Sequence, residues 1–120
     1  MTTHLIISTA NELIRVATDS IVYISSDGNY STIVQSDGDV RLVTYQLGHI
    51  EKLIADQLHE AGNDFIRIGK SLIINRNYIY VINIAKQQLI LSNNISSKLS
   101  VNASREALKK LKELIQNDVK

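Results

Sequence analysis

Two Asp-Gly dipeptides, Asp27-Gly28 and Asp37-Gly38, separate three short runs of residues that are rich in β-branched side chains. Asp-Gly between such runs is a strong hairpin signal, because glycine readily adopts the positive φ that tight turns require. The three runs are Ser20–Ser25, Asn29–Gln35 and Val40–Tyr45. We therefore expect three consecutive strands that form an antiparallel meander.

Similar runs precede and follow this meander. Turn-like residues at 9–11 separate the first two of them, and the triplet 92–94 is typical of a hairpin loop between the last two. The expected further strands are His4–Ser8, Glu12–Ala17, Phe65–Ile68, Leu72–Asn75, Tyr78–Ile84, Gln87–Leu91 and Ile95–Val101.

Apolar residues recur at helical spacing in two segments, which predicts amphipathic helices at 47–59 and at about 104–117. Gly62 follows the first helix, and Ser104 suits the N-cap of the second, with Glu106 near the positive end of its dipole. The buried stripe of the second helix is expected to comprise Leu108, Leu111, Leu114 and Ile115.

Strands and helices do not alternate along the chain, so a doubly wound parallel sheet is not expected. A mainly β fold of antiparallel sheets with two helices fits the pattern better. The chain has 120 residues, no proline and no evident linker or repeat, which predicts a single domain over residues 1–120.

Composition excludes several classes of protein. The absence of cysteine excludes disulfides and thiolate zinc sites. The N-terminal residues lack a basic segment, and their apolar run Leu5-Ile6-Ile7 is too short for a signal peptide or a membrane span, so we expect a cytoplasmic protein.

The net charge of +1 conceals a marked asymmetry. Residues 1–64 hold three basic and nine acidic side chains, a balance of −6, whereas residues 65–120 hold ten basic and three acidic ones, a balance of +7. Such asymmetry suggests an anionic partner, most commonly a nucleic acid, although helix lysines also form ordinary solvated faces.

The sequence contains no recognisable catalytic motif: neither a phosphate-binding glycine loop nor a nucleophile elbow is present. A metal site could be drawn from Asp56, His59 and Glu60, but their spacing matches no recurrent ligand motif. We therefore expect no enzyme, no cofactor, no metal and no small-molecule substrate.

Polar residues at the expected turns are the remaining candidates for function: Asn29, Lys70-Ser71 and the segment 102–105. Asparagine can pair with adenine, and lysine or arginine with guanine or phosphate. The asparagines could equally serve turn or cap geometry. Gly69 and Lys70 interrupt an apolar run, which favours an exposed bend that presents Lys70 outward.

These segments resemble the LytTR family of bacterial DNA-binding domains. The matching stretches are SIVYISSDGNYSTI (20–33), FIRIGKSLIINRNYI (65–79) and KLSVNASREALKKLKEL (98–114), in the expected order and separation over essentially the whole chain. The middle stretch is the most specific. The resemblance implies an elongated fold of several small antiparallel sheets with two short helices, whose loops contact successive major grooves of duplex DNA.

Carried over to this chain, the resemblance implies base contacts from Asn29, Lys70 and Asn102. It also implies phosphate or supporting contacts from Arg67, Ser71 and Arg105, and it includes Gly69 and Tyr30 among the residues of the contacting loops. For Tyr30 we expect packing at the base of its loop rather than contact with the DNA backbone.

The chain departs from the family pattern in two places. Many members have histidine at the position of Gly69, and many have a basic residue near Asn102. Members often carry an upstream receiver domain or membrane segment; we expect neither ahead of the DNA-binding region here, and so no phosphorylation switch on this chain. We therefore expect either a stand-alone regulator or an effector domain cut from a longer response regulator.

The leading hypothesis is a bacterial transcriptional regulator that binds double-stranded DNA sequence-specifically, with a second copy on a repeated half-site as a further expectation and no membrane partner. The alternative is a protein-interaction or adaptor domain that keeps the fold and has lost specific DNA recognition. The glycine at position 69 and the small net charge are its main support.

Overall fold

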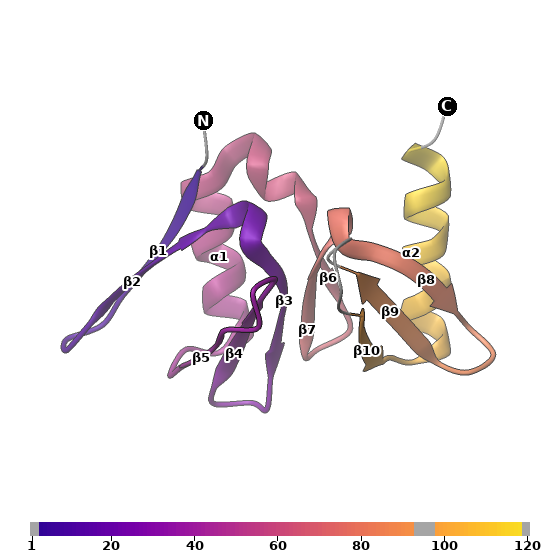
Figure 1. Ribbon diagram of the computed structural model, residues 1–120, viewed down its shortest axis with the longest axis horizontal. Coiled ribbons are helices and arrows are strands. Elements are labelled where there is room, and N and C mark those ends of the chain that lie inside the picture. Colours follow the sequence, from indigo (N-terminus) through magenta and orange to yellow (C-terminus); the bar gives the residue numbers. More distant parts are fainter. Residues whose placement is uncertain (1–2, 93–97, 119–120) are drawn as a thin grey trace. The chain divides into compact units, whose positions relative to one another are not determined.

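The computed structural model describes residues 3–92 and 98–118, which fall into two compact units, Met1–Arg76 and Asn77–Lys120. We call them the N-terminal and C-terminal units and describe each by itself (Figure 1). No helix within the described ranges is long and apolar enough to cross a membrane.

The N-terminal unit begins with a two-stranded antiparallel ribbon of β1 (His4–Ser8) and β2 (Leu13–Ala17). A five-stranded antiparallel sheet follows, in the order β5-β4-β3-β7-β6. Its strands are β3 (Ile21–Ser26), β4 (Ser31–Gln35), β5 (Val40–Val43), β6 (Phe65–Ile68) and β7 (Leu72–Asn75).

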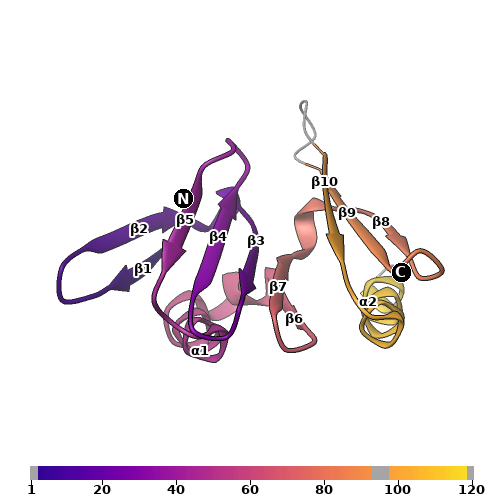
Figure 2. The same ribbon diagram turned by 90° about the horizontal axis from the view of Figure 1, so that it is seen from below.

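The expected meander is present as β3-β4-β5 (Figure 2). Both of its Asp-Gly turns have the backbone that motivated the prediction, with φ of +112° at Gly28 and +93° at Gly38. Asn29 and Tyr30 lie before β4 rather than in it, so they belong to the β3–β4 loop.

Helix α1 (Leu47–Leu58) contacts β1, β3 and β7 and closes the core of the N-terminal unit. It ends one residue before the expected end, and Gly62 lies in the 3₁₀ segment His59–Asp64 that follows. Ribbon, sheet and helix contribute apolar side chains to one cluster, which comprises Leu5, Ile7, Val16, Ile21, Ile24, Ile33, Val43, Leu47, Ile50, Ile54, Leu58 and Ile73.

Side-chain hydrogen bonds fix the parts of this unit to one another. The buried amide of Asn75 donates from Nδ2 to the Ile21 carbonyl at 2.9 Å and so joins β7 to the start of β3. The Gln57 amide, from α1, bonds both backbone groups of Ile6: it accepts from the N–H at 2.9 Å and donates to the carbonyl at 2.8 Å.

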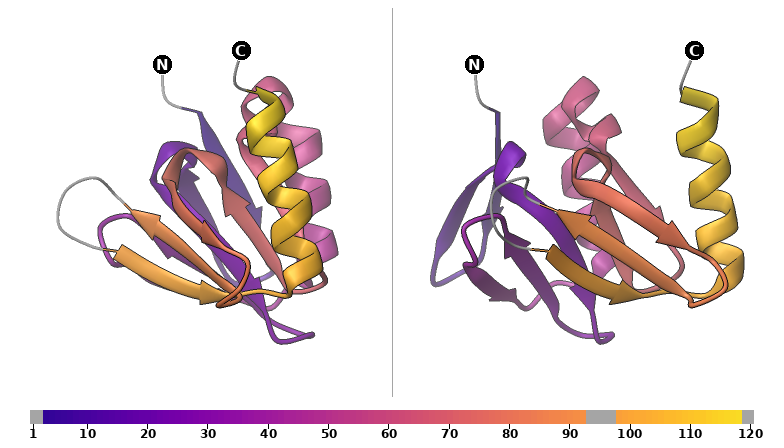
Figure 3. Two further views of the ribbon diagram at one scale, coloured as in Figure 1. Left: turned by 90° about the vertical axis from the view of Figure 1, so that its right-hand side faces the viewer. Right: turned by 45° about the vertical axis from the view of Figure 1, so that its right-hand side comes forward.

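The C-terminal unit contains a three-stranded antiparallel sheet in the order β10-β9-β8 and the helix α2 (Arg105–Asp118), which contacts β8 (Figure 3). The strands are β8 (Ile79–Asn83), β9 (Gln88–Ser92) and β10 (Lys98–Asn102). The first residues of the expected strand Ile95–Val101, and most of the expected loop 92–94, lie outside the described residues.

The mainly β fold of several small antiparallel sheets with two helices is therefore confirmed. One expectation about α2 is wrong: Leu108 and Leu111 are buried, but Leu114 is 43% exposed. At 3.6 residues per turn, Leu114 lies about 120° from Leu108 around the helix, outside the buried arc.

Candidate nucleic-acid interface

The β3–β4 loop is held by its own polar groups and leaves one side chain unused. The Tyr30 N–H donates to Oδ1 of Asp27 at 3.0 Å, and the Gly28 N–H donates to Oγ of Ser26 at 3.0 Å. Asn29 is exposed, and its side chain forms no hydrogen bond with any described residue. The loop thus presents an amide that can donate and accept hydrogen bonds.

Tyr30 does not pack at the base of this loop. Its side chain is 44% exposed, so the expectation of packing is wrong. The loop is closed without the ring, because the backbone of Tyr30 is already bonded to Asp27 at both ends: the Asp27 N–H donates to the Tyr30 carbonyl at 3.2 Å.

The β6–β7 turn has the expected exposed bend. Gly69 adopts φ +66°, a left-handed conformation that is costly for other residues, and the next residue, Lys70, is exposed. Lys70 forms no ion pair with a described residue. Its ammonium group is therefore available to an anion.

Arg67 fixes this turn from behind. Its Nη2 donates to the Lys70 carbonyl at 3.0 Å, and its Nη1 donates to Oε1 of Glu51, on α1, at 2.9 Å. The guanidinium charge is thus already paired, and the side chain is only 29% exposed. This geometry favours a supporting role for Arg67 over a direct phosphate contact.

The β6–β7 turn and the β3–β4 loop lie next to each other, because the Ser26 N–H donates to the Ser71 carbonyl at 2.9 Å. Together with the start of α1 they line one shallow depression, formed by Ser26, Asp27, Gly28, Gln46, Leu47, Gly48, Arg67, Lys70 and Ser71. α1 has neither a side-chain cap nor an acidic residue in its first turn, so its N–H groups add positive potential there.

In the C-terminal unit, the β10–α2 connection is also tightly held. Asn102 is the last residue of β10, and the next N–H, of Ala103, donates to the Gln87 carbonyl at 3.2 Å. Ser104 caps α2 as expected, since its Oγ accepts from the Ala107 N–H at 3.1 Å. Asn102 and Arg105, on either side of this cap, are both exposed.

The sequence analysis did not predict two residues that lie near Asn102. Lys86 and Gln87, from the β8–β9 turn, line a shallow depression with Asn102, Ala103 and Ser104. The antiparallel pairing of Asn102 with Gln88 is the reason. Since the expected strands β9 and β10 form a hairpin, that pairing could have indicated that the β8–β9 turn lies beside the β10–α2 connection.

The eight predicted residues thus fall into two groups. Asn29, Tyr30, Arg67, Gly69, Lys70 and Ser71 lie together on the N-terminal unit, and Asn102 and Arg105 lie together on the C-terminal unit. Among the described residues, no three or more histidine, aspartate or glutamate side chains are arranged so that they could hold a metal ion. The set Asp56, His59 and Glu60 is therefore not such a group.

The candidate residues lie on exposed loops of small antiparallel sheets, and comparison with known proteins identifies the family of such a chain. The model of the LytTr DNA-binding domain matches residues 11–116. The chain belongs to this family, which is a family of DNA-binding domains and not of enzymes.

A solved structure agrees with this assignment at the level of fold. The chain is similar to the LytTr DNA-binding domain of a Bacillus cereus protein described as a methyl-accepting/DNA response regulator, with a TM-score of 0.63 and 19% sequence identity. The match covers 96% of this chain and 98% of that one. No curated protein matches the chain at a significant level.

Proposed function

We propose that this protein binds double-stranded DNA sequence-specifically and regulates transcription in a bacterial cytoplasm. Its loops contact bases in successive major grooves, with Asn29, Lys70 and Asn102 as the base-reading residues. Ser71 and Arg105 contact phosphates, Arg67 supports the β6–β7 turn, and the exposed ring of Tyr30 lies against the DNA backbone.

The observation that carries this proposal is the construction of the β6–β7 turn. An exposed, unpaired Lys70 follows a glycine with φ +66°, and the backbone behind it is bonded to Arg67. A base-reading side chain must be held in a fixed position, and a rigid sheet with a clamped turn provides this. A lysine can donate to the O6 and N7 acceptors of guanine.

Most of the affinity is expected to come from phosphate contacts, so binding should weaken steeply as salt concentration rises. Specificity then depends on a small number of base contacts from the loops. Both properties can be measured separately.

The test is selection of bound duplexes from a randomised pool at near-physiological salt, followed by sequencing. Enrichment of a short motif, repeated at about one helical turn if two copies bind, supports a specific regulator. If no motif is enriched and retention disappears at higher salt, the protein is an adaptor domain with a nonspecific basic surface, and the proposal is wrong.

Lys70→Ala should weaken binding to the selected duplex by about 1–3 kcal/mol and relax the preference at one base position. Lys52→Ala, which removes an exposed lysine of α1, is the matched control and should leave that preference unchanged. A Lys70→Ala variant with the wild-type motif and affinity would remove Lys70 from the site.

A further inference from the structure

The exposed surface of α2 carries two rows of charged side chains that differ in character. Successive residues of a helix are rotated by about 100°, so Arg105, Lys109 and Lys112 lie within about 60° of one another. The neighbouring row consists of Glu106, Lys110 and Glu113. All six side chains are exposed.

The mixed row compensates its own charge, because Glu106 lies four residues before Lys110, the favourable order on a helix. The basic row is compensated only at Lys109, which lies three residues after Glu106 and four before Glu113; Arg105 and Lys112 have no carboxylate at i±3 or i±4. Arg105 and Lys109 are like charges at i,i+4, Lys109 and Lys112 are like charges at i,i+3, and each such pair disfavours the helix by a few tenths of a kcal/mol. Arg105 also stands in the first turn, where the helix dipole disfavours a cation.

No ion pair with a described residue offsets this repulsion. None of the three basic side chains forms an ion pair with a carboxylate of the described residues, including Glu106 and Glu113. If the row served only the stability of α2, an acidic residue would be expected in it, because such a residue would remove the like-charge repulsion. The row is therefore better explained by an anion outside the chain.

The basic row begins beside the Asn102 depression. Nη2 of Arg105 lies 3.5 Å from the Ala85 carbonyl oxygen, in the β8–β9 turn, and the next residue of that turn is the exposed Lys86. The residues that line this depression with Lys86 and Asn102 include no carboxylate. We call Lys86, Arg105, Lys109 and Lys112 together the basic track.

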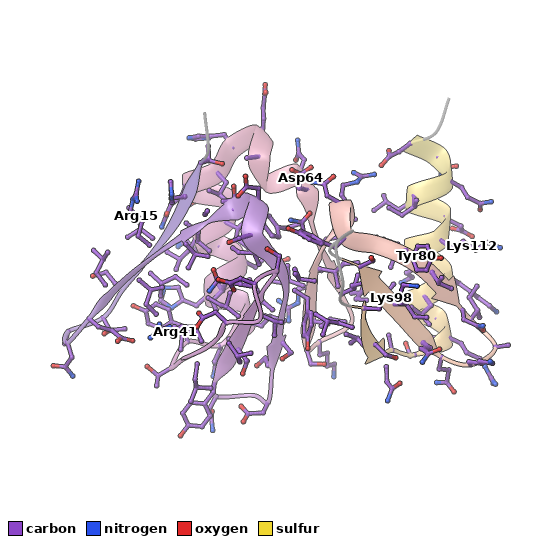
Figure 4. The ribbon with its side chains drawn as sticks, viewed as in Figure 1. Arg15, Arg41, Asp64, Tyr80, Lys98 and Lys112 are labelled. Carbon is purple, nitrogen blue, oxygen red and sulfur yellow. The ribbon has the colours of Figure 1, made fainter. Side chains whose placement is uncertain are left out.

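Two further side chains of the C-terminal unit, Lys98 and Leu114, do not belong to the track. Lys98 is not part of it, since its Nζ lies 4.8 Å from the centroid of the Tyr80 ring, whereas Lys112 points away from α2 toward open space (Figure 4). Leu114, the exposed apolar residue of α2, lies about 180° from Arg105 around the helix. A helix that lies on a membrane needs apolar side chains beside its basic ones, and this row has none that are exposed.

We infer that the basic track binds the sugar-phosphate backbone of DNA that flanks the bases read at Asn102. This inference rests on the proposed function and adds to it a sequence-independent contact surface. From Arg105 to Lys112 the helix rises about 10 Å, which is about the length of DNA axis over which one strand places three phosphates.

The experiment measures the salt dependence of binding to the selected duplex and to a scrambled one. The variants are Lys109→Gln, Lys112→Gln and the double variant. The control is K52Q/K110Q, which changes net charge equally on exposed helix positions outside the basic row. Glutamine and lysine have similar helix propensities, and the substitutions remove like-charge pairs, so no variant should have a lower Tm than the wild type.

Each lysine–phosphate contact that a substitution removes should reduce the slope of log K against log salt by about 0.9. Between 50 and 200 mM salt, the wild type should therefore lose roughly tenfold more affinity than the double variant. The ratio of affinities for the two duplexes should not change, and the control should keep the wild-type slope.

Two results would overturn the inference. One is a control that reduces the slope as much as the double variant does, which would indicate a general charge effect. The other is a double variant with an unchanged slope. Sedimentation with vesicles of anionic lipid would then show whether the track binds a membrane instead. Failure of the proposed function looks different: the wild type would prefer no duplex over another, while its salt slope remained measurable.

Discussion

At the scale of single residues, the two basic side chains of the β6–β7 turn, Lys70 and Arg67, differ in exposure and in bonding. Lys70 is exposed and unpaired, whereas Arg67 is bonded to Glu51 and to the Lys70 carbonyl. A planar guanidinium can bridge two acceptors in fixed directions, which an ammonium group cannot do in the same way. Arg67 should therefore affect DNA binding through the position of Lys70 rather than through its own charge.

Arg67→Lys and Arg67→Met should consequently weaken binding to the selected duplex by similar amounts, about five- to tenfold, or about 1–1.4 kcal/mol. The salt slope should stay at the wild-type value in both variants, because the charge of Arg67 is already paired with Glu51. Titrations at several salt concentrations measure both quantities.

A different pattern of affinities would contradict the supporting role of Arg67. If Arg67→Lys bound like the wild type while Arg67→Met lost affinity and about 0.9 of its salt slope, Arg67 would be a phosphate contact. Thermal unfolding of both variants separates a loss of binding from a loss of structure.

The sequence allowed the exposure of Lys70 to be predicted, because a glycine in an apolar run indicates a bend. It did not indicate the partner of Arg67, since Glu51 lies 16 residues away on a different element. The wrong expectation for Tyr30 has a similar cause. Local hydrogen bonds of Asp27 close the loop, and an aromatic residue is then not needed to anchor it.

At the scale of elements, the start of α2 combines a helix cap with two candidate contact residues in one short segment. Ser104 caps the helix, and the residues on either side, Asn102 and Arg105, are candidates for DNA contact. The cap therefore fixes where β10 ends and where the basic row of α2 begins.

Ser104→Ala should lower the free energy of unfolding by about 1 kcal/mol, within a range of about 0.5–2 kcal/mol, because the Ala107 N–H loses its acceptor. Denaturant unfolding measures this value. Ser8→Ala, at an exposed strand position whose hydroxyl forms no hydrogen bond with described residues, should change it by less than about 0.5 kcal/mol. Equal effects of the two substitutions would show that the cap contributes nothing particular.

Most elements could be predicted from local patterns, since β-branched runs and turn residues define strands and helical spacing defines helices. The order of strands in the larger sheet could not. β3 pairs with β7, almost 50 residues later in the sequence, and only the shared burial of their side chains in one core selects that neighbour. Local patterns do not encode such a choice.

At the scale of the whole molecule, the chain consists of two units of unequal size. The C-terminal unit comprises Asn77–Lys120, which is 44 residues. A segment this short buries too little apolar surface to be reliably stable without disulfides, metals or a partner, and the chain has no cysteine. We therefore propose that residues 1–120 form a single cooperative domain.

This proposal predicts one unfolding transition. In a denaturant titration followed by NMR, native amide signals from β3 and β7 should disappear with the same midpoint as those from β8 and β9. A midpoint for the C-terminal unit that is clearly lower than that of the N-terminal unit would contradict the single-domain hypothesis.

The hydrogen bonds between Gln57 and Ile6 have a consequence for how the protein behaves in concentrated solution. The outer strand of a ribbon normally offers free N–H and C=O groups, to which an extended segment of another molecule can add. Here a side-chain amide from α1 already occupies both groups at the middle of β1. The folded protein thereby protects this strand from intermolecular pairing and the aggregation that such pairing can initiate.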